Sequence, residues 1–167
     1  LKLGDDLSNI ILTPSAWLTL MQSQYDPKGL GSPFLAKLKI GFSRICKRSG
    51  GNIDFKKPLD DDFQKIGHKI MKEILHANEN PIYFDRSNCP DGYELSRISA
   101  FADSSAICLQ TVIYGVFQCK KTKKTHTSLH AAKTAIVHNS IPKNELMSIV
   151  AANRLVINYV TGVDCKL

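Results

Sequence analysis

Hydrophobic and polar positions divide this chain into a helical first part and a strand-rich second part. Apolar residues recur at helical spacing after Thr13, across residues 33–47, and from the acids at 60–62 to Leu75. Proline follows Thr13 and opens the second segment, and glycines follow that segment, as at many helix starts and ends. We therefore predict three helices within residues 1–78.

The pattern changes to that of strands after the proline-containing stretch 78–91. Residues 94–106 alternate partly apolar positions, residues 107–117 are rich in β-branched and aromatic side chains, and residues 127–137 form a weaker third candidate. Three strands in succession favour an antiparallel meander. We place a domain boundary in the proline-containing stretch, with a second domain over residues 79–167.

A long amphipathic helix is predicted after the third strand. The dipeptide Ile141-Pro142 is typical of a helix start, Glu145 lies close to the positive end of the helix dipole, and the pattern continues to about Tyr159. The predicted fold class is α+β or α/β, with a helical segment, a three-strand meander and this helix. We assign the apolar stripe of the helix to Leu146, Ile149, Val150, Leu155, Val156 and Tyr159.

Asp103 and Glu145 carry the clearest candidate chemistry. Asp103 falls where the first predicted strand ends, and Glu145 opens the helix at the end nearest the strand tips. Two carboxylates placed in this way can hold hard cations such as Mg²⁺, and two bound ions can activate water and stabilise a leaving oxygen. The alternative is purely local, with a turn acid and a first-turn helix acid. Spacing alone leaves both interpretations open.

Four separated motifs give the chain a resemblance that runs from about Met21 to Leu167. They are residues 25–33 (Tyr-Asp-Pro-Lys-Gly-Leu-Gly-Ser-Pro), 53–59 (Ile-Asp-Phe-Lys-Lys-Pro-Leu), 101–105 (Phe-Ala-Asp-Ser-Ser), and 131–134 joined to 141–146 (Ala-Ala-Lys-Thr and Ile-Pro-Lys-Asn-Glu-Leu). In this order they resemble the polymerase polyprotein of Pao/BEL-type long terminal repeat retrotransposons, a family also described as Pao retrotransposon peptidases of the A17 type. The second motif is the loosest, because Ile53 stands where the family has tryptophan.

The resemblance implies a region that runs from the connection after a reverse transcriptase into a ribonuclease H-like domain. Such domains cut the RNA strand of an RNA/DNA hybrid with Mg²⁺ or Mn²⁺. In family terms Asp103 and Glu145 resemble the first two catalytic, metal-binding acids. The third and fourth acids are expected beyond Leu167, and Asp164 is interpreted as a turn acid before a fourth strand.

The resemblance implies four catalytic acids, of which this chain holds two, and this affects what the isolated chain can do. Catalysis by a metal-binding cluster is usually lost as a unit, so we expect the isolated chain to be inactive without the downstream part of the domain. The strand that ends at Asp103 is also expected to present an unpaired edge.

Other classes of activity find less support in the sequence. The chain holds no Asp-Thr/Ser-Gly protease motif and no pair of adjacent aspartates on an apolar hairpin, so we expect neither peptidase nor polymerase chemistry. A second function stays open, that of a non-catalytic retroelement-derived relic or a co-opted nucleic-acid-binding or interaction module.

Charge and composition change this picture little. A formal net charge of +7 is compatible with a nucleic-acid partner. Five cysteines without a Cys-x-x-Cys pair favour a reducing, intracellular compartment, either cytoplasmic or nuclear. His126 and His130 lie too far apart on a strand to suggest zinc, and no apolar run suggests a membrane partner. A hairpin tip that either contacts nucleic acid or is simply solvated is expected at Lys120, Lys121, Lys123 and Lys124.

Overall fold

The computed structural model describes residues 7–24, 26, 28–80 and 89–164, and it divides the chain into two compact units. The first unit comprises Leu1–Tyr25 and Pro33–Tyr83. The second comprises Asp26–Ser32 and Phe84–Leu167. Of the helices in the described part, none is long and apolar enough to cross a membrane.

The first unit is helical, as the sequence predicts. After a short 3-10 helix, η1 (Leu7–Asn9), come α1 (Pro14–Gln22), α2 (Ser32–Arg48) and α3 (Asp61–Glu79). The Thr13 hydroxyl caps α1 by accepting a hydrogen bond from the Ala16 amide at 3.1 Å. Gly50 and Gly51 end the second helix with positive φ angles of 60° and 88°.

Trp17 is the centre of the core of the first unit. Its ring is fully buried, and its Nε1 donates a hydrogen bond to the Leu38 backbone oxygen at 2.9 Å, so the polar atom of the indole is satisfied. Gly41 lies against the ring so closely that a Cβ atom there would stand 2.3 Å from Trp17 Cζ2. The other buried members of this core are Leu38, Ile45, Phe63, Ile70 and Ile74.

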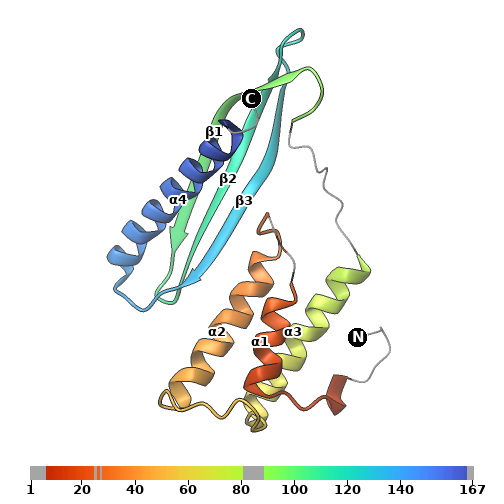
Figure 1. Ribbon diagram of the computed structural model, residues 1–167, viewed down its shortest axis with the longest axis vertical. Coiled ribbons are helices and arrows are strands. Elements are labelled where there is room, and N and C mark those ends of the chain that lie inside the picture. Colours follow the sequence, from red (N-terminus) through yellow and green to blue (C-terminus); the bar gives the residue numbers. More distant parts are fainter. Residues whose placement is uncertain (1–6, 25, 27, 81–88, 165–167) are drawn as a thin grey trace. The chain divides into compact units, whose positions relative to one another are not determined.

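The second unit is a three-stranded antiparallel sheet covered on one face by a helix (Figure 1). The strands β1 (Tyr93–Ser104), β2 (Cys108–Cys119) and β3 (Thr125–Ile136) follow in the order β1-β2-β3, which confirms the predicted meander. The helix α4 (Ile141–Asp164) packs on β1 and β2. Among the described residues β1 pairs with β2 alone, so its other edge has no strand partner.

The face that α4 buries differs from the predicted apolar stripe. Asn144, Ser148 and Ala152 are buried at a spacing of four residues, whereas Leu146 and Val150 are 63% and 43% exposed. Ile149 is exposed as well. The prediction that Leu146, Ile149 and Val150 form the buried stripe is therefore wrong. Small side chains let the helix approach the sheet closely, and this outweighs the burial of the larger apolar residues.

The end of α4 also departs from the sequence prediction. The helix continues five residues past Tyr159, to Asp164, so Asp164 belongs to the helix and is not a turn acid before a strand. Residues 165–167 lie outside the described part, and with them the remainder of the predicted approach to a fourth strand.

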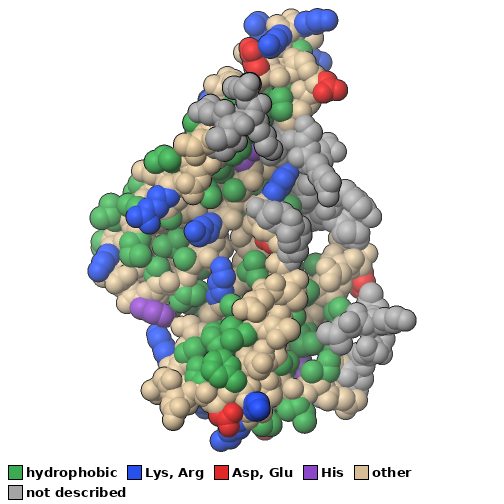
Figure 2. All heavy atoms as spheres, viewed as in Figure 1, with side chains coloured by type: hydrophobic (Ala, Val, Ile, Leu, Met, Phe, Trp, Pro, Cys, Tyr) green, Lys and Arg blue, Asp and Glu red, His purple; other side chains and the backbone are tan. Residues whose placement is uncertain are grey.

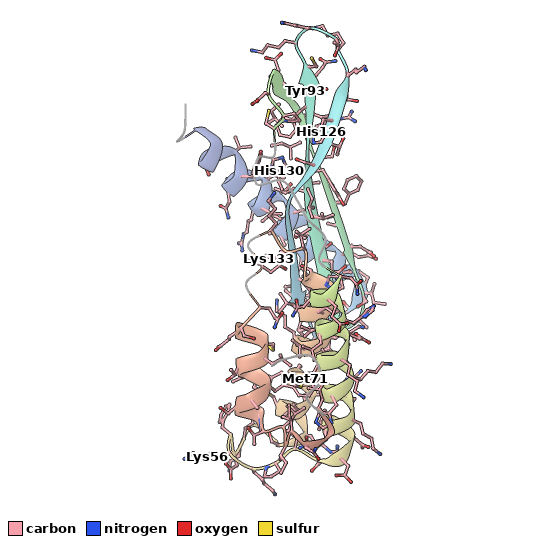
Figure 3. All side chains as sticks on the ribbon, turned by 90° about the vertical axis from the view of Figure 1, so that its right-hand side faces the viewer. Lys56, Met71, Tyr93, His126, His130 and Lys133 are labelled. Carbon is pink, nitrogen blue, oxygen red and sulfur yellow. The ribbon has the colours of Figure 1, made fainter. Side chains whose placement is uncertain are left out.

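A β-bulge places His130 between the sheet and α4. The pairing of β2 with β3 shifts between Ile113 and Tyr114, which leaves His130 as the extra residue of β3. His130, labelled in Figure 3, is 6% exposed. Its Nε2 lies 3.3 Å from the Tyr159 hydroxyl on α4. Gly115 makes room for the imidazole, because a Cβ atom there would stand 2.1 Å from His130 Nε2. Burial and the charge of Lys28 lower the pKa of His130.

The first family-like motif, residues 25–33, contributes a turn to the second unit. Both carboxylate oxygens of Asp26 accept hydrogen bonds at 2.7 Å, from the amides of Leu30 and Gly31. The Lys28 backbone oxygen accepts a 2.7 Å bond from the Ala132 amide on β3. Gly29 has a φ of 76° and is in contact with the β3 backbone, which explains why glycine is needed there. Tyr25 and Pro27 of this motif lie outside the described residues.

Candidate functional site at the end of the sheet

Asp103 lies at the end of β1, as the sequence predicts. It is the second-last residue of the strand, it pairs with Gln110 on β2, and its side chain is exposed. One carboxylate oxygen accepts a 2.8 Å hydrogen bond from the Ser104 amide. The other oxygen is available to a ligand from solvent, because it has no hydrogen-bonding partner among the described residues.

The two faces of the sheet separate Asp103 from the residues beneath α4. Ser104 is directly opposite Leu109, which lines a groove beside α4. Since side chains alternate along a strand, Asp103 projects from the other face. Asp103 and Glu145 therefore reach this end of the sheet from different sides.

Glu145 lies in the first turns of α4. Its side chain is exposed, and within the described part of the chain its carboxylate makes no hydrogen bond or ion pair. The backbone oxygen of Glu145 accepts a 2.7 Å bond from the Ser148 hydroxyl, one turn further along the helix.

Asn144 links the start of α4 to the turn after β1 and was missed by the sequence analysis. Its side chain is fully buried, and Nδ2 donates to the backbone oxygens of Ser105 at 2.9 Å and Asn139 at 3.2 Å. Ser105 follows β1 two residues after Asp103, so this bond fixes the helix start to the strand end. The signal available in the sequence was an asparagine beside Glu145 in an otherwise local helix-start pattern.

Two buried oxygens at this end of the sheet have no protein partner. They are Oδ1 of Asn144 and the hydroxyl of Ser104, both without a hydrogen bond among the described residues. Buried oxygens of this kind are usually satisfied by ordered water. Asp103 and Glu145 are thus two exposed carboxylates that reach this end of the sheet from different faces, with two buried oxygens suited to ordered water nearby.

Further protein ligands for a metal are not supplied by the described residues. No group of three or more His, Cys, Asp or Glu side chains lies close enough together there to hold an ion. His126, which was weighed as a zinc ligand, is exposed and makes an edge contact with the ring of Tyr93, and His130 is the buried bulge residue (Figure 3).

The four hairpin lysines lie where the sequence predicts them, in the turn between β2 and β3. All of them are exposed, and Lys120 forms an ion pair with Glu94 at 3.4 Å. Cys119 begins this turn, and its sulfur accepts a hydrogen bond from the Thr122 amide at 3.5 Å. Hydrogen bonds from Thr122 and Lys121, together with the charge of Lys123, lower the pKa of the Cys119 thiol.

A comparison with protein families identifies the chain. Residues 13–167 match the family described as the Pao retrotransposon-like RNaseH-like domain. The chain belongs to this family. The match confirms the resemblance to a Pao/BEL retrotransposon polyprotein and agrees with the α+β fold, in which a meander is followed by a helix. No curated protein and no solved structure matches the chain.

Membership of the Pao ribonuclease H-like family covers both units of the structure. The match begins at Thr13, one residue before α1, and so includes nearly all of the helical unit as well as the sheet. It does not specify which residues bind a ligand, so the roles of Asp103, Glu145 and the hairpin lysines stay predictions.

Proposed function

We propose that this chain supplies the first two metal-binding carboxylates of a ribonuclease H-type endonuclease that cuts the RNA strand of RNA/DNA hybrids. The observation that carries the proposal is the Asn144 bond to Ser105, which holds the start of α4 against the end of β1. Family membership supplies the ribonuclease H-like setting. The localisation that fits this role is intracellular.

Asp103 and Glu145 are the residues that would hold Mg²⁺ or Mn²⁺. Bound ions would supply the activation of water and the neutralisation of charge on the leaving oxygen. The chain itself contributes two exposed carboxylates, and the Asn144 bond to Ser105 supports the proposal because it holds the start of α4 near the end of β1. With two carboxylates alone, affinity for the ion would be weak, and phosphate oxygens of the nucleic acid would complete the coordination.

The hairpin lysines are the part of the chain suited to the hybrid backbone. Their charges lie at one tip of the sheet, and Lys121, Lys123 and Lys124 form no ion pair with an acid of the described residues. The affinity that such phosphate contacts give falls as the salt concentration rises and does not depend on base sequence. This is expected for an enzyme that recognises a hybrid by its helical geometry.

The metal-binding part of the proposal is tested by titrating the purified chain with Mn²⁺ and following free ion by electron paramagnetic resonance. We expect weak binding that Asp103→Asn and Glu145→Gln each reduce severalfold and that the double variant abolishes. Asp91→Asn is the matched control, because Asp91 is an exposed acid of the same unit located just before β1. Equal binding by the double variant and the wild type would show that these acids do not form the site.

The catalytic part is tested with a labelled RNA/DNA hybrid. We expect the chain alone to bind the hybrid without cleaving it, and a longer product that supplies two further acids to cleave it in the presence of Mg²⁺. Asp103→Asn in that longer product should stop cleavage while leaving hybrid binding intact. Cleavage that survives this substitution would remove Asp103 from the catalytic site.

The alternative function is that of a non-catalytic nucleic-acid-binding module derived from a retroelement. It is favoured by the contrast between four exposed lysines in one turn and the lack of a group of three metal-binding side chains in the described part. The same hybrid experiment separates the alternatives. A binding module would bind single-stranded and duplex nucleic acid equally well, and divalent ions would not change its binding.

A further inference from the structure

The first half of α4 buries polar side chains against the sheet, whereas several of its large apolar side chains are exposed. Asn144 and Ser148 are 0% and 2% exposed. Figure 2 shows hydrophobic side chains gathered on the surface over α4. A helix that covers a sheet usually buries its apolar stripe. The reversed arrangement at the start of α4 makes the groups beneath the helix decisive, because buried polar atoms require hydrogen bonds.

The sheet presents hydroxyl groups on the same side. Leu109 on β2 lines the groove beside α4, and it pairs with Ser104 at the end of β1. Thr111, two residues further along β2, is 2% exposed. Because paired residues share a face and side chains alternate along a strand, Ser104 and Thr111 both point towards α4. They are diagonal neighbours, about 7–8 Å apart. We call Ser104, Thr111, Asn144 and Ser148 the polar layer.

Three side-chain oxygens of the polar layer have no hydrogen-bonding partner among the described residues. They are Oγ of Ser104, Oγ1 of Thr111 and Oδ1 of Asn144, and each of these atoms is closed off from solvent. The fourth member, Ser148, donates its hydroxyl to the Glu145 backbone oxygen and keeps lone pairs that can accept a hydrogen bond. Three buried oxygens left unpaired in one layer would destabilise a small unit considerably.

We propose that the polar layer binds a small cluster of ordered water molecules between α4 and the sheet. An internal water molecule usually makes about three hydrogen bonds. The layer offers suitable groups from both sides, hydroxyls from the two strands and the Asn144 amide oxygen from the helix. Asn144 lies over the end of β1, because its Nδ2 donates to the Ser105 backbone oxygen. The water joins the start of α4 to β1 and β2 beside this direct bond.

Water fits the polar layer better than other occupants. The three oxygens are already closed off from solvent, so a further protein segment reaches them only by displacing the residues that cover them. A divalent metal ion is disfavoured, because the layer holds no charged side chain and such ions prefer carboxylates. The inference does not depend on metal binding by Asp103 and Glu145, and its failure would leave that proposal untouched.

Relaxation dispersion of the water oxygen-17 nucleus in a solution of the full chain measures long-lived internal water. Thr111→Val keeps the shape of the side chain and removes the hydroxyl, so we expect the amplitude of the dispersion to fall below that of the wild type. Thr127→Val, the same change at an exposed position of β3, is the control and should leave the amplitude unchanged. An amplitude that Thr111→Val does not lower would overturn the proposal.

Hydrogen exchange of the second unit tests the polar layer through the sign of a stability change. If water pairs the Thr111 hydroxyl, Thr111→Val removes hydrogen bonds, and we expect the amides of β2 to lose protection severalfold. A dry, unpaired hydroxyl predicts the opposite, because valine would then remove only the cost of burying a polar group. Protection that rises in Thr111→Val, or that equals the wild type, would therefore contradict bound water.

Ser104→Ala is a second variant that keeps the test informative should Thr111→Val fail to fold. It should likewise reduce the amplitude of the dispersion and the protection of β1 amides. Ser96→Ala, at an exposed position of the same strand, is its control and should change neither. Equal effects of Ser104→Ala and Ser96→Ala would show that the polar layer does not hold the water and would overturn the proposal.

Discussion

Asn144 Nδ2 donates a 2.9 Å hydrogen bond to the backbone oxygen of Ser105, across 39 positions of sequence. The bond joins the first turns of α4 to the turn that follows β1. The side chain of Asn144 is fully buried, and its amide also donates to the Asn139 backbone oxygen. This amide therefore helps to hold Glu145 near the end of β1, together with the packing of α4 on β1 and β2.

Asn144→Ala should lower the free energy of unfolding of the second unit by about 1–3 kcal/mol, because it removes the donor of two hydrogen bonds, to the backbone oxygens of Ser105 and Asn139. Hydrogen exchange of peptides from β1 and the start of α4 would measure the loss, since the single tryptophan of the chain, Trp17, reports on the other unit. Asn158→Ala, at an exposed position of the same helix, is the control. Equal protection in both variants would contradict a role for the Ser105 bond.

Gly29 and Gly92 provide a matched pair for testing the turn on β3. Their φ angles are 76° and 79°, so alanine brings similar backbone strain at both positions. A Cβ atom at Gly29 would stand 2.0 Å from the Ala132 backbone oxygen, whereas at Gly92 it meets open space.

Gly29→Ala should therefore reduce the protection of β3 amides from hydrogen exchange much more than Gly92→Ala does. Strain at φ alone costs about 1–2 kcal/mol, and displacing the turn from β3 adds to it at Gly29. Similar losses at the two glycines would show that the contact with Ala132 contributes nothing to the stability of the strand.

Local signals in the sequence were sufficient to predict the helices and strands, but not to predict which face of α4 is buried. Thr13, Pro14 and Gly50 mark helix ends through backbone chemistry, so the helices of the first unit were predicted well. The buried face of α4 was predicted wrongly. Hydrophobicity indicated Leu146 and Val150, whereas the small side chains of Ser148 and Ala152 are the ones that are buried. Which face packs is decided by the shape of the sheet, which a single sequence does not contain.

The candidate site shows the same limit. Asp103 and Glu145 could be proposed from strand and helix boundaries, since each is defined by its neighbours in sequence. Asn144 could not, because its role depends on a contact with Ser105 that only the folded chain creates. His130 was likewise hidden, because the bulge that turns it toward Tyr159 leaves no mark in the alternation of β3.

Gly41→Ala tests two opposed effects in the first unit. Alanine in a helix interior is favoured over glycine by up to about 1 kcal/mol, yet the added Cβ would stand 2.3 Å from Trp17 Cζ2. Overpacking a core costs about 1–3 kcal/mol, so we expect net destabilisation, measured by urea unfolding with Trp17 fluorescence. Gly50→Ala is the control, because nothing lies within contact distance there and its cost comes from φ alone. A more stable Gly41→Ala variant would mean that the tryptophan ring moves aside freely.

The buried His130 should make the stability of the second unit depend on pH. Its folded-state pKa lies below the ordinary value of 6.5, since burial and Lys28 both disfavour the charged form, whereas the unfolded chain protonates normally. Between these two pKa values the unfolded state binds more protons, so the stability is complete above pH 6.5 and declines as the pH falls below it. The Tyr159 hydroxyl, 3.3 Å from Nε2, is the polar group that faces the ring from α4.

Replacing His130 by glutamine should remove this component of the pH dependence while lowering stability at neutral pH, where the packing against Phe117 and Tyr159 is lost. His126→Gln, an exposed histidine of the same strand, is the matched control and should retain the decline. Hydrogen exchange of β2 and β3 at pH 7.5 and pH 5.5, corrected for the intrinsic exchange rates, measures the difference. A decline of the same size in His130→Gln and in the wild type would assign the effect to other groups, and a stability that rises as the pH falls would reverse the sign argued from burial.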